Sequence, residues 1–563
     1  MSTKERFNNQ VEEIATRAHK MRQLCVDSQF HPVTREFISD DAERLAAIDA
    51  VAQQEPMFES LSDEHRQQIV SGMASAVAEY SNENGKEPSD EVLATAHKSM
   101  ESMLVPDSSS KSREAQMMCE SIGESLSTSN GVEVRARMAG IVLPTLLATA
   151  TSDAVAYVPA ATDEIEFFKV NRVAGTSFGD FKKGQVIDDA TVGQYSQMRQ
   201  RYPFVTEQQP DGTKKEFVFV SKTDLKNTSV EIPFKKGSVA VFFNHQRVAT
   251  DFDQMNGKLY GDIKTADGSI SVNGTIDYVA GTVTVTTTAA LDAGKKLHIQ
   301  FEIDIEAKPE LIPTIDHDME SRKMRPSQSA IACDATIQAM FKMNREFGID
   351  LKSMQMTQLR NYLANEKAIK HLTDMAFACY HTGTFNTYCP ADADWKLQRE
   401  LLREKLLNVS QEMLKNTGTT GLSGLYMGTQ AATYVKALGA PFFTPAPNYK
   451  QVNRVHFCGT LFGMWRVYEV PVAIEGIGTW DILGYGRGSN HTEAGYVAAD
   501  AIPATMYNHP IGANLRSRDT LWELSYGEVQ PFDGSEYFYK LTLVNSAPAA
   551  EVETEVKTAK KAK

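Results

Sequence analysis

The composition of this 563-residue chain changes abruptly near residue 125, so its two parts cannot share one folding pattern. Residues 1–124 contain 3 of the 35 glycines and carry 12 Lys and Arg against 23 Asp and Glu. Their net charge of -11 is most of the total of -14, which leaves -3 for residues 125–563. A glycine-poor segment rich in Ala, Glu, Gln and Met predicts helices. Gly, Thr, Val, Phe and Tyr rise together after it, which favours β-structure.

Apolar residues in the first segment recur at helical spacing, as in Ile69, Met73 and Val77. Asn82–Asp90 predicts a loop between helices, and Pro106–Ser112 predicts a polar linker. Large apolar residues are few here. We therefore expect helices without a private core, which form either a solvated helical domain or a detachable assembly segment.

Several protein classes are excluded by composition. An acidic chain without a basic patch argues against sequence-specific nucleic-acid binding. The first residues lack the apolar stretch of a secretory signal. The longest apolar run, Ala139–Ala150, is shorter than the ~20 residues of a membrane span and contains Pro144. The six cysteines follow no disulfide framework, so we expect reduced thiols in a cytosolic setting.

Residues 231–306 predict a compact all-β domain, because short strand-like runs alternate with turn signals such as Asp267-Gly268 and Ala280-Gly281. The spacing is typical of a small β-sandwich of immunoglobulin-like size. The predicted strands are Val230–Phe234, Val239–Asn244, Gln246–Phe252, Gly274–Val279, Thr282–Thr287 and Leu297–Ile305. A further strand is expected at Ile165–Val173.

Two helices in series are expected after this domain, at 334–347 and 350–380, separated by Gly348. About thirty residues at 1.5 Å per residue give a second helix of roughly 45 Å. Its apolar side predicts a strut lying on a sheet, formed by Leu359, Tyr362, Leu363, Ile369, Leu372 and Met375. Further elements are expected at 395–416 (helix), 422–427 (strand), 429–438 (helix), and 457–470, 474–485, 522–526 and 537–544 (strands), before a polar tail at 546–563.

Motifs that would carry chemistry are weak. Gly484–Gly488 lacks the spacing of a dinucleotide-binding loop, and Asp316-His317-Asp318 would point to alternate faces of a strand. Cys379, His381 and Cys389, with His371 upstream, lack the spacing of a zinc site. We find no nucleophile elbow and no metalloprotease motif. The sequence therefore favours a structural or binding role, and it predicts no enzyme activity, cofactor or metal.

The order of segments over residues ~125–545 resembles the major capsid proteins of tailed bacteriophages, which have the HK97-like fold, and their T-even-like branch in particular. The resemblance lies in segments that follow one another in the family's order. These segments are Met324–Ser329, Met343–Asp350, Thr357–Leu363, Ala368–Leu372, Trp395–Leu438, Phe457–Tyr468, Ile482–Ser489 and Glu493–Asp500.

The resemblance implies an α+β protein with the HK97-like capsid fold. It assigns 125–230 to an N-terminal arm and an extended loop that embraces a neighbouring subunit, and 231–306 to an inserted immunoglobulin-like domain. Residues 307–545 would hold the spine helix with the peripheral and axial domains. Residues 1–124 would be a fused scaffolding (delta-type) segment, whose negative charge would repel packaged DNA.

A cleavage site follows from the same resemblance. The T-even-like prohead protease prefers Ile/Leu-x-Glu, and Ile122-Gly123-Glu124 matches this pattern at the composition boundary. We therefore predict cleavage between Glu124 and Ser125. Leu402-Arg403-Glu404 and Leu521-Trp522-Glu523 also match, but they lie in expected folded elements.

The function implied is that of a major capsid protein, which forms hexamers and pentamers of an icosahedral head around double-stranded DNA. The implied location is the virion, with assembly in the host cytoplasm. Expected partners are other copies of the chain, a prohead protease, portal, vertex or decoration proteins, and DNA in non-specific contact, with no membrane. Two alternatives remain: an encapsulin-like bacterial nanocompartment shell, and an intracellular enzyme carrying a β-sandwich binding module.

Overall fold

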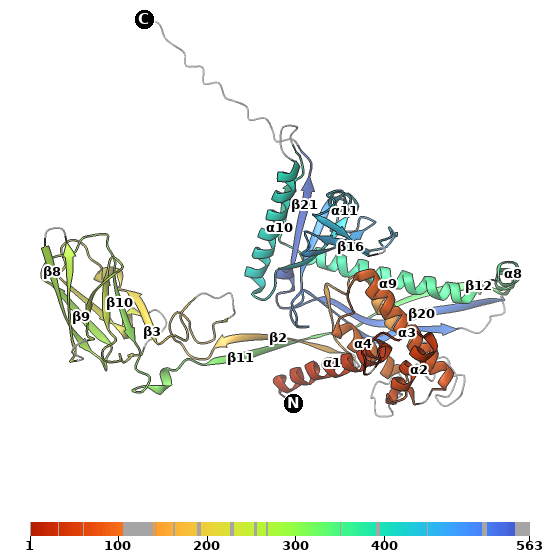
Figure 1. Ribbon diagram of the computed structural model, residues 1–563, viewed down its shortest axis with the longest axis horizontal. Coiled ribbons are helices and arrows are strands. Elements are labelled where there is room, and N and C mark those ends of the chain that lie inside the picture. Colours follow the sequence, from red (N-terminus) through yellow and green to blue (C-terminus); the bar gives the residue numbers. More distant parts are fainter. Residues whose placement is uncertain are drawn as a thin grey trace, which may run out of the picture. The chain divides into compact units, whose positions relative to one another are not determined.

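The computed structural model divides the chain into two compact units, described separately below (Figure 1). Unit 1 comprises Met1–Lys169 and Glu320–Lys563, and unit 2 comprises Val170–Met319. The structure describes residues 2–104 and 139–546, except 32, 60, 141, 161–163, 188–192, 226–229, 253–255, 266–267, 349–350, 390–394, 448 and 509–514. Among the helices so described, none combines the length and the apolarity needed to cross a bilayer.

A four-stranded sheet with a long helix against it forms one part of unit 1. The strand order is β1 (Val155–Tyr157), β19 (Tyr496–Asn508), β20 (Arg516–Val529), β12 (Ser327–Thr336). Helix α9 (Leu351–Ala378) contacts β20 and β12. Leu359 and Leu363 of α9 are buried with Leu521 of β20. Tyr362, which we expected on the buried side, is 58% exposed.

A buried ion cluster joins α9 to this sheet. Lys367 Nζ lies 3.1 Å from Asp500 Oδ1 of β19 and 2.8 Å from Glu523 Oε2 of β20. Burial raises the pKa of Glu523, and the Lys367 charge opposes that rise. Burial lowers the pKa of Lys367, but the two carboxylates outweigh it and raise the value above its usual range. The ammonium group is therefore charged and tied to both strands.

A seven-stranded mixed sheet forms a second part of unit 1, in the order β13, β21, β18, β14, β17, β16, β15. Helix α10 (Trp395–Thr417) packs on it through Leu402, Leu406, Val409 and Met413, and α11 (Thr429–Lys436) lies against β14 and β17. The strand bounds are β13 Thr382–Asn386, β14 Leu422–Gly428, β15 Phe443–Pro445, β16 His456–Leu461, β17 Trp465–Val470, β18 Asp481–Gly486 and β21 Phe538–Val544.

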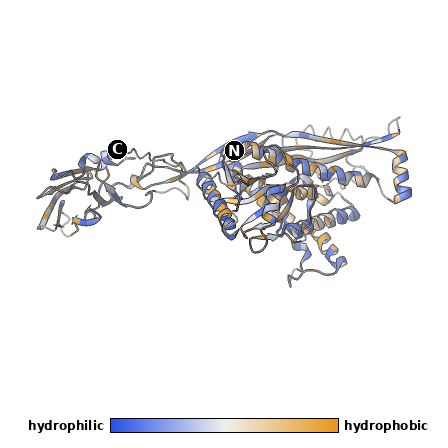
Figure 2. Ribbon diagram, turned by 90° about the horizontal axis from the view of Figure 1, so that it is seen from above, coloured by the Kyte–Doolittle hydropathy of each residue, from blue (hydrophilic) through white to orange (hydrophobic). Residues whose placement is uncertain are grey.

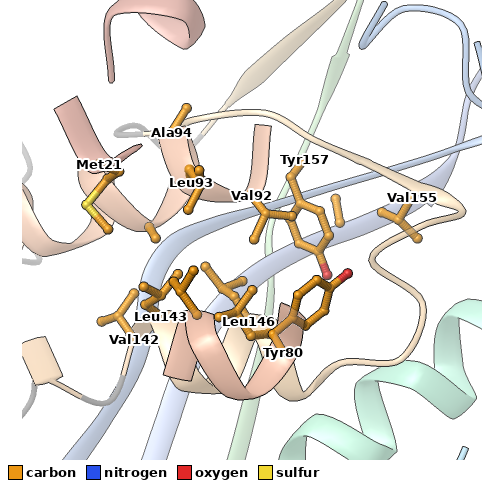
Figure 3. Close-up of a cluster of buried hydrophobic side chains, with 14 of the residues drawn as sticks. Met21, Tyr80, Val92, Leu93, Ala94, Val142, Leu143, Leu146, Val155 and Tyr157 are labelled. Carbon is orange, nitrogen blue, oxygen red and sulfur yellow. The ribbon is translucent and has the colours of Figure 1, made fainter. Parts of the chain in front are cut away.

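Four helices occupy the described part of residues 1–124, and our expectation that they lack a core within the chain is wrong. They are α1 (Thr3–Cys25), α2 (Asp41–Ala52), α3 (Asp63–Asn84) and α4 (Asp90–Leu104). Their buried residues share one cluster with residues 142–147 and with β1 (Figure 3). The reason is that the helices bury their own large apolar residues, such as Leu24, Ile69 and Leu93, together with alanines and methionines, and later segments add to the same cluster.

Unit 2 contains eight strands joined in one hydrogen-bonded sheet, in the order β3, β10, β5, β6, β7, β8, β9, β4. Every strand contributes to a common core or packs against it, so the sheet folds around its own apolar face. We predicted a sandwich beginning at residue 231, but β3 and β4 precede that residue. The bounds are β3 Arg199–Pro203, β4 Glu216–Val220, β5 Ala240–Phe243, β6 Gln246–Thr250, β7 Lys258–Thr265, β8 Gly268–Asp277, β9 Thr282–Thr287 and β10 Leu297–Glu302.

Two features of unit 2 differ from the sequence prediction in detail. The predicted strand at 230–234 is reduced to an isolated bridge between Phe234 and Ile303. The predicted β8–β9 turn is present, with Gly281 at φ 64°, and a Cβ there would lie 2.0 Å from the Ile232 carbonyl oxygen. Further short helices lie at Asp27–Gln29, Pro56–Phe58, Thr206–Gln208, Ser221–Asp224, Pro309–Leu311 and Gly534–Tyr537, and residues 142–148 are helical as well.

The ion cluster leads to a stability prediction. Lys367→Ala leaves Asp500 and Glu523 as buried carboxylates without a cation, so we expect the free energy of unfolding to fall by about 3–5 kcal/mol. Urea denaturation of the full chain measures this loss. The matched control is Lys370→Ala on the exposed side of the same helix, which should change stability by less than ~0.5 kcal/mol. Equal losses in the two variants would contradict the role of the cluster.

Candidate assembly surfaces

The residues singled out from the sequence do not form a common site in the described part of the chain. Glu124 and Ser125 lie outside the described residues. His371 is buried and its Nδ1 lies 2.9 Å from Thr151 Oγ1, whereas His381 Nε2 lies 2.7 Å from Glu536 Oε2. Cys379 Sγ donates to the His381 carbonyl oxygen at 3.3 Å. These contacts stabilise the fold, and they do not bring the residues together as a metal site.

The other two motifs are also explained by their place in the fold. Asp316, His317 and Asp318 are exposed on strand β11 (Ile315–Met324), where successive side chains alternate between faces. Gly484 and Gly486 belong to β18, where close neighbours leave no room for a Cβ: Leu422 Cδ1 would lie 2.6 Å from one at Gly484.

The first candidate surface is the ribbon of β2 (Ile165–Ala174) and β11, which form a two-stranded sheet of their own. The chain crosses between unit 1 and unit 2 along these two strands. Every residue of β11 is exposed except the half-buried Met319 and the buried Met324. Strand β2, in contrast, buries Ile165, Phe167 and Phe168, and the first two share an apolar cluster with Met324. The exposed side chains of β11 are therefore the part of the ribbon that a further chain could cover.

The second candidate surface is helix α8 (Ile337–Phe347), which contains no buried residue. Thr336 caps its start by accepting a hydrogen bond from the Ala339 amide, and Gly348 ends it at φ 65°. Hydrophobic and hydrophilic residues both occur along it (Figure 2). At 100° per residue, Ile337, Phe341 and Phe347 fall on one side.

These three side chains are 39%, 61% and 66% exposed, respectively. A helix of eleven residues has marginal stability in water unless one face is packed. The apolar side of α8 is therefore a second surface that favours a partner.

The N-terminal helices, in contrast, are already docked within unit 1. Glu91 of α4 is buried, forms an ion pair with Arg487, and accepts the Tyr157 amide at 3.2 Å. Asp153 contacts both Lys86 Nζ at 2.5 Å and Arg466 Nε at 2.8 Å, so it links the α3–α4 loop to β17. These ion pairs surround the shared apolar cluster.

Two neutral histidines lie in the same contacts. His97 of α4 is 3% exposed, and Arg17 of α1 donates to its Nδ1 at 3.0 Å. His491 stacks on Phe7, with ring centroids 6.0 Å apart, and its Nε2 donates to Gln10 Oε1 at 3.3 Å. Burial lowers the pKa of each to about 4, with Arg17 and Arg487 adding to the effect, respectively.

Comparison with known proteins assigns the chain to a family. Residues 2–149 match a family model described as a domain of unknown function, DUF8615. The chain is 33% identical to Protein IncB of Escherichia coli over 181 residues, which are 32% of this chain and 86% of that protein. The chain belongs to the same family as Protein IncB. The DUF8615 match extends across residues 124 and 125, on both sides of the predicted cleavage point.

Solved structures to which the chain is similar include shells. The capsid of the jumbo bacteriophage PhiKZ has a TM-score of 0.34 and 7% identity, over 68% of this chain and 90% of that chain. The capsid of an empty GTA particle has a TM-score of 0.27 and 13% identity, over 41% and 77%. The SrpI encapsulin of Synechococcus elongatus has a TM-score of 0.26 and 13% identity, over 40% and 77%.

The buried histidines predict acid sensitivity. Unfolded histidine binds a proton below about pH 6.5, whereas folded His97 and His491 resist protonation until about pH 4. The unfolded state therefore binds more protons than the folded state between about pH 6.5 and pH 4. As the pH is lowered through this range, the free energy of unfolding should decrease by about 1.4 kcal/mol per pH unit for each histidine.

Urea denaturation at several pH values between 7 and 4 measures that slope, with pH as the only variable. His97→Gln and His491→Gln should each flatten it, whereas His19→Gln, at an exposed position of α1, should leave it unchanged. A slope that is the same in all three variants would contradict the assignment.

Proposed function

We propose that this chain is a major capsid protein, whose copies assemble into hexamers and pentamers of an icosahedral phage head around double-stranded DNA. The observation that carries the proposal is strand β11 of the β2–β11 ribbon, whose residues are exposed except Met319 and Met324. A neighbouring subunit would cover these exposed side chains.

A second copy of the same chain is the partner that fits best. Head-to-tail contacts place one surface of a subunit on a different surface of the next, and they generate closed rings when the rotation closes. The ribbon and the apolar side of α8 are two different surfaces, as this arrangement requires. Repetition around a ring would cover both surfaces in every subunit, and each interface would add to the stability of the shell.

The order of elements along the chain also supports the proposal. The ribbon strand β2 is followed by an inserted β domain, the returning strand β11, the 28-residue helix α9, and then the seven-stranded sheet with α10 and α11. This is the order that the sequence resemblance implies for arm, extended loop, spine helix and axial domain. Assignment to the T-even-like branch stays a prediction.

The charge distribution is compatible with enclosed DNA. Residues 125–563 carry a net charge of only -3, so their contact with DNA phosphates would be weak and non-specific. The same balance would suit a nanocompartment shell, which encloses protein. Particles that protect double-stranded DNA from nuclease would support the phage head, and particles filled with protein would support the nanocompartment.

Assembly can be tested on the purified chain by electron microscopy and sedimentation. We expect closed shells for the natural sequence, and small soluble species for Phe341→Glu/Phe347→Glu, because charge on the apolar side of α8 opposes its burial. Val33→Glu, at an 83% exposed position, is the matched control and should still assemble. A discrete soluble oligomer formed by the natural chain under all assembly conditions would overturn the proposal.

We further propose cleavage between Glu124 and Ser125 by a prohead protease. Helices α1–α4 share a buried cluster with residues 142–147 and β1, so hydrolysis of one peptide bond leaves that core in place. Release of the helices would need a rearrangement of unit 1 during maturation.

Denaturing mass spectrometry of particles should therefore find two fragments, one ending at Glu124 and one beginning at Ser125. The two fragments should stay together in chromatography under native conditions. Glu124→Ala should abolish the cleavage, whereas Glu404→Ala, in a match within helix α10, should not. An intact chain from Met1 in mature particles would refute the cleavage.

A further inference from the structure

Three side chains with metal-binding atoms converge at the hairpin of β16 and β17. His456 and Cys458 belong to β16, and Glu469 belongs to β17 directly opposite His456. The pairing slips between Phe457 and Gly459, so Cys458 is the extra residue of a bulge. Bulges re-aim side chains, and this one turns the thiol toward the carboxylate. The three ligand atoms lie within 4.8 Å of one another.

The spacing of these atoms is that of a tetrahedral metal site. Cys458 Sγ lies 3.7 Å from His456 Nε2 and 3.7 Å from Glu469 Oε2, and the last two atoms are 3.6 Å apart. Around a tetrahedral Zn²⁺, bonds of 2.0–2.3 Å put neighbouring N, O and S ligands about 3.3–3.6 Å from one another. Small inward shifts of a few tenths of an ångström would complete the geometry.

The histidine is prepared for this role by its backbone partner. His456 Nδ1 lies 2.8 Å from the Arg454 carbonyl oxygen, which can only accept, so Nδ1 carries the proton. The lone pair is therefore on Nε2, the atom that faces Cys458 and Glu469. A histidine whose other nitrogen donates to a carbonyl is the usual arrangement in metal sites, because it fixes the tautomer and the ring orientation.

The carboxylate is held in place in the same way. Lys436 Nζ of α11 donates to Glu469 Oε2 at 2.8 Å and lies 3.4 Å from the Tyr449 hydroxyl. A carboxylate oxygen has two lone pairs, so this contact leaves one lone pair of Oε2, and all of Oε1, for a cation. Cys458 is fully buried and Glu469 is 3% exposed, so the donors are shielded from solvent.

A cavity lies beside the histidine of the cluster. His456 lies in the wall of a cavity of 630 Å³ in unit 1, together with Tyr449 and Tyr80. This cavity is large enough for water, and three protein ligands with one water are a common zinc coordination set. Nitrogen, sulfur and oxygen donors together favour Zn²⁺ over Mg²⁺ or Ca²⁺, which prefer oxygen alone.

We propose that His456, Cys458 and Glu469 bind a Zn²⁺ ion, with a water molecule from the cavity as fourth ligand. Burial and the neighbouring Glu469 raise the pKa of the metal-free Cys458 thiol to about 12. Binding therefore forms the zinc–sulfur bond with release of one proton from the thiol to solvent, and no oxidant or reductant is involved. The ion would tie β16 to β17 next to the cavity.

The test uses the full-length chain, stripped with a chelator and titrated with Co²⁺ as a spectroscopic substitute for zinc. We expect a thiolate-to-cobalt charge-transfer band that saturates at one ion per chain and is abolished by added Zn²⁺. One proton should be released for each ion bound, as followed with a pH indicator. A chain that binds no cobalt, or binds it without the thiolate band, would overturn the proposal.

Variants locate the site. Cys458→Ser should remove the band, and His456→Ala should weaken cobalt binding by more than about tenfold. Because His456 lies at the cavity wall, its truncation is the variant less disruptive to folding, and circular dichroism would verify this. Cys379→Ser is the matched control, since Cys379 is a partly buried thiol that contacts the His381 backbone elsewhere in unit 1. Loss of the band in Cys379→Ser but not in Cys458→Ser would refute the assignment.

Discussion

The contact of α9 with β19 and β20 is the interaction on which the rest of unit 1 depends. Leu359 and Leu363 bury one stretch of the helix against β20, and Lys367 places a charge between the two strands. Further along, Leu372 and Met375 join the cluster that also contains the N-terminal helices. One helix therefore links the four-stranded sheet to the N-terminal helices. A substitution that destabilises α9 would therefore weaken the packing of both the four-stranded sheet and the N-terminal helices.

The acidic N-terminal segment gains a different meaning from this packing. Its charge of -11 predicts a separate module, whereas the structure places the described helices in unit 1. Their apolar sides meet residues 142–147, β1 and the end of α9. Glu91, one of the acidic residues, is buried and paired with Arg487. Part of the negative charge thus holds the segment to unit 1, and the exposed remainder is free to act on whatever the proposed shell encloses.

The sequence predicts helices with one apolar side well, because their periodicity is local. Helix α10 and the glycine-capped end of α8 lie within about three residues of the predicted bounds. Strand β11 is not among the predicted strands, since half of the residues of Ile315–Met324 are charged and apolar residues do not alternate. The segments of β3 and β4 are included in the predicted arm and extended loop for a related reason: the strands are short, and their partners β10 and β9 are distant in sequence.

The candidate metal site could not be predicted from the sequence, because its residues meet only in the folded sheet. His456 and Cys458 are two residues apart, a spacing that can place both on one face of a strand. Glu469 comes close to them only because of the register of a hairpin that contains a bulge. The bulge has no clear signature in the residues that form it. Cys379 and His381 are the nearest set in the sequence, but they lack the spacing of a zinc site, and the fold uses them for packing.

The pairing of β2 with β11 has a consequence for how such a chain can change over time. The chain leaves unit 1 on one strand of the ribbon and returns on its hydrogen-bonded neighbour, so residues 170–319 are an insertion whose two ends lie side by side. The length and identity of that insertion can vary while the register of the ribbon is kept, because domains are inserted most readily where the two junctions lie side by side. The same junctions are natural points for grafting a foreign domain, of which the proposed shell would display one copy on each subunit.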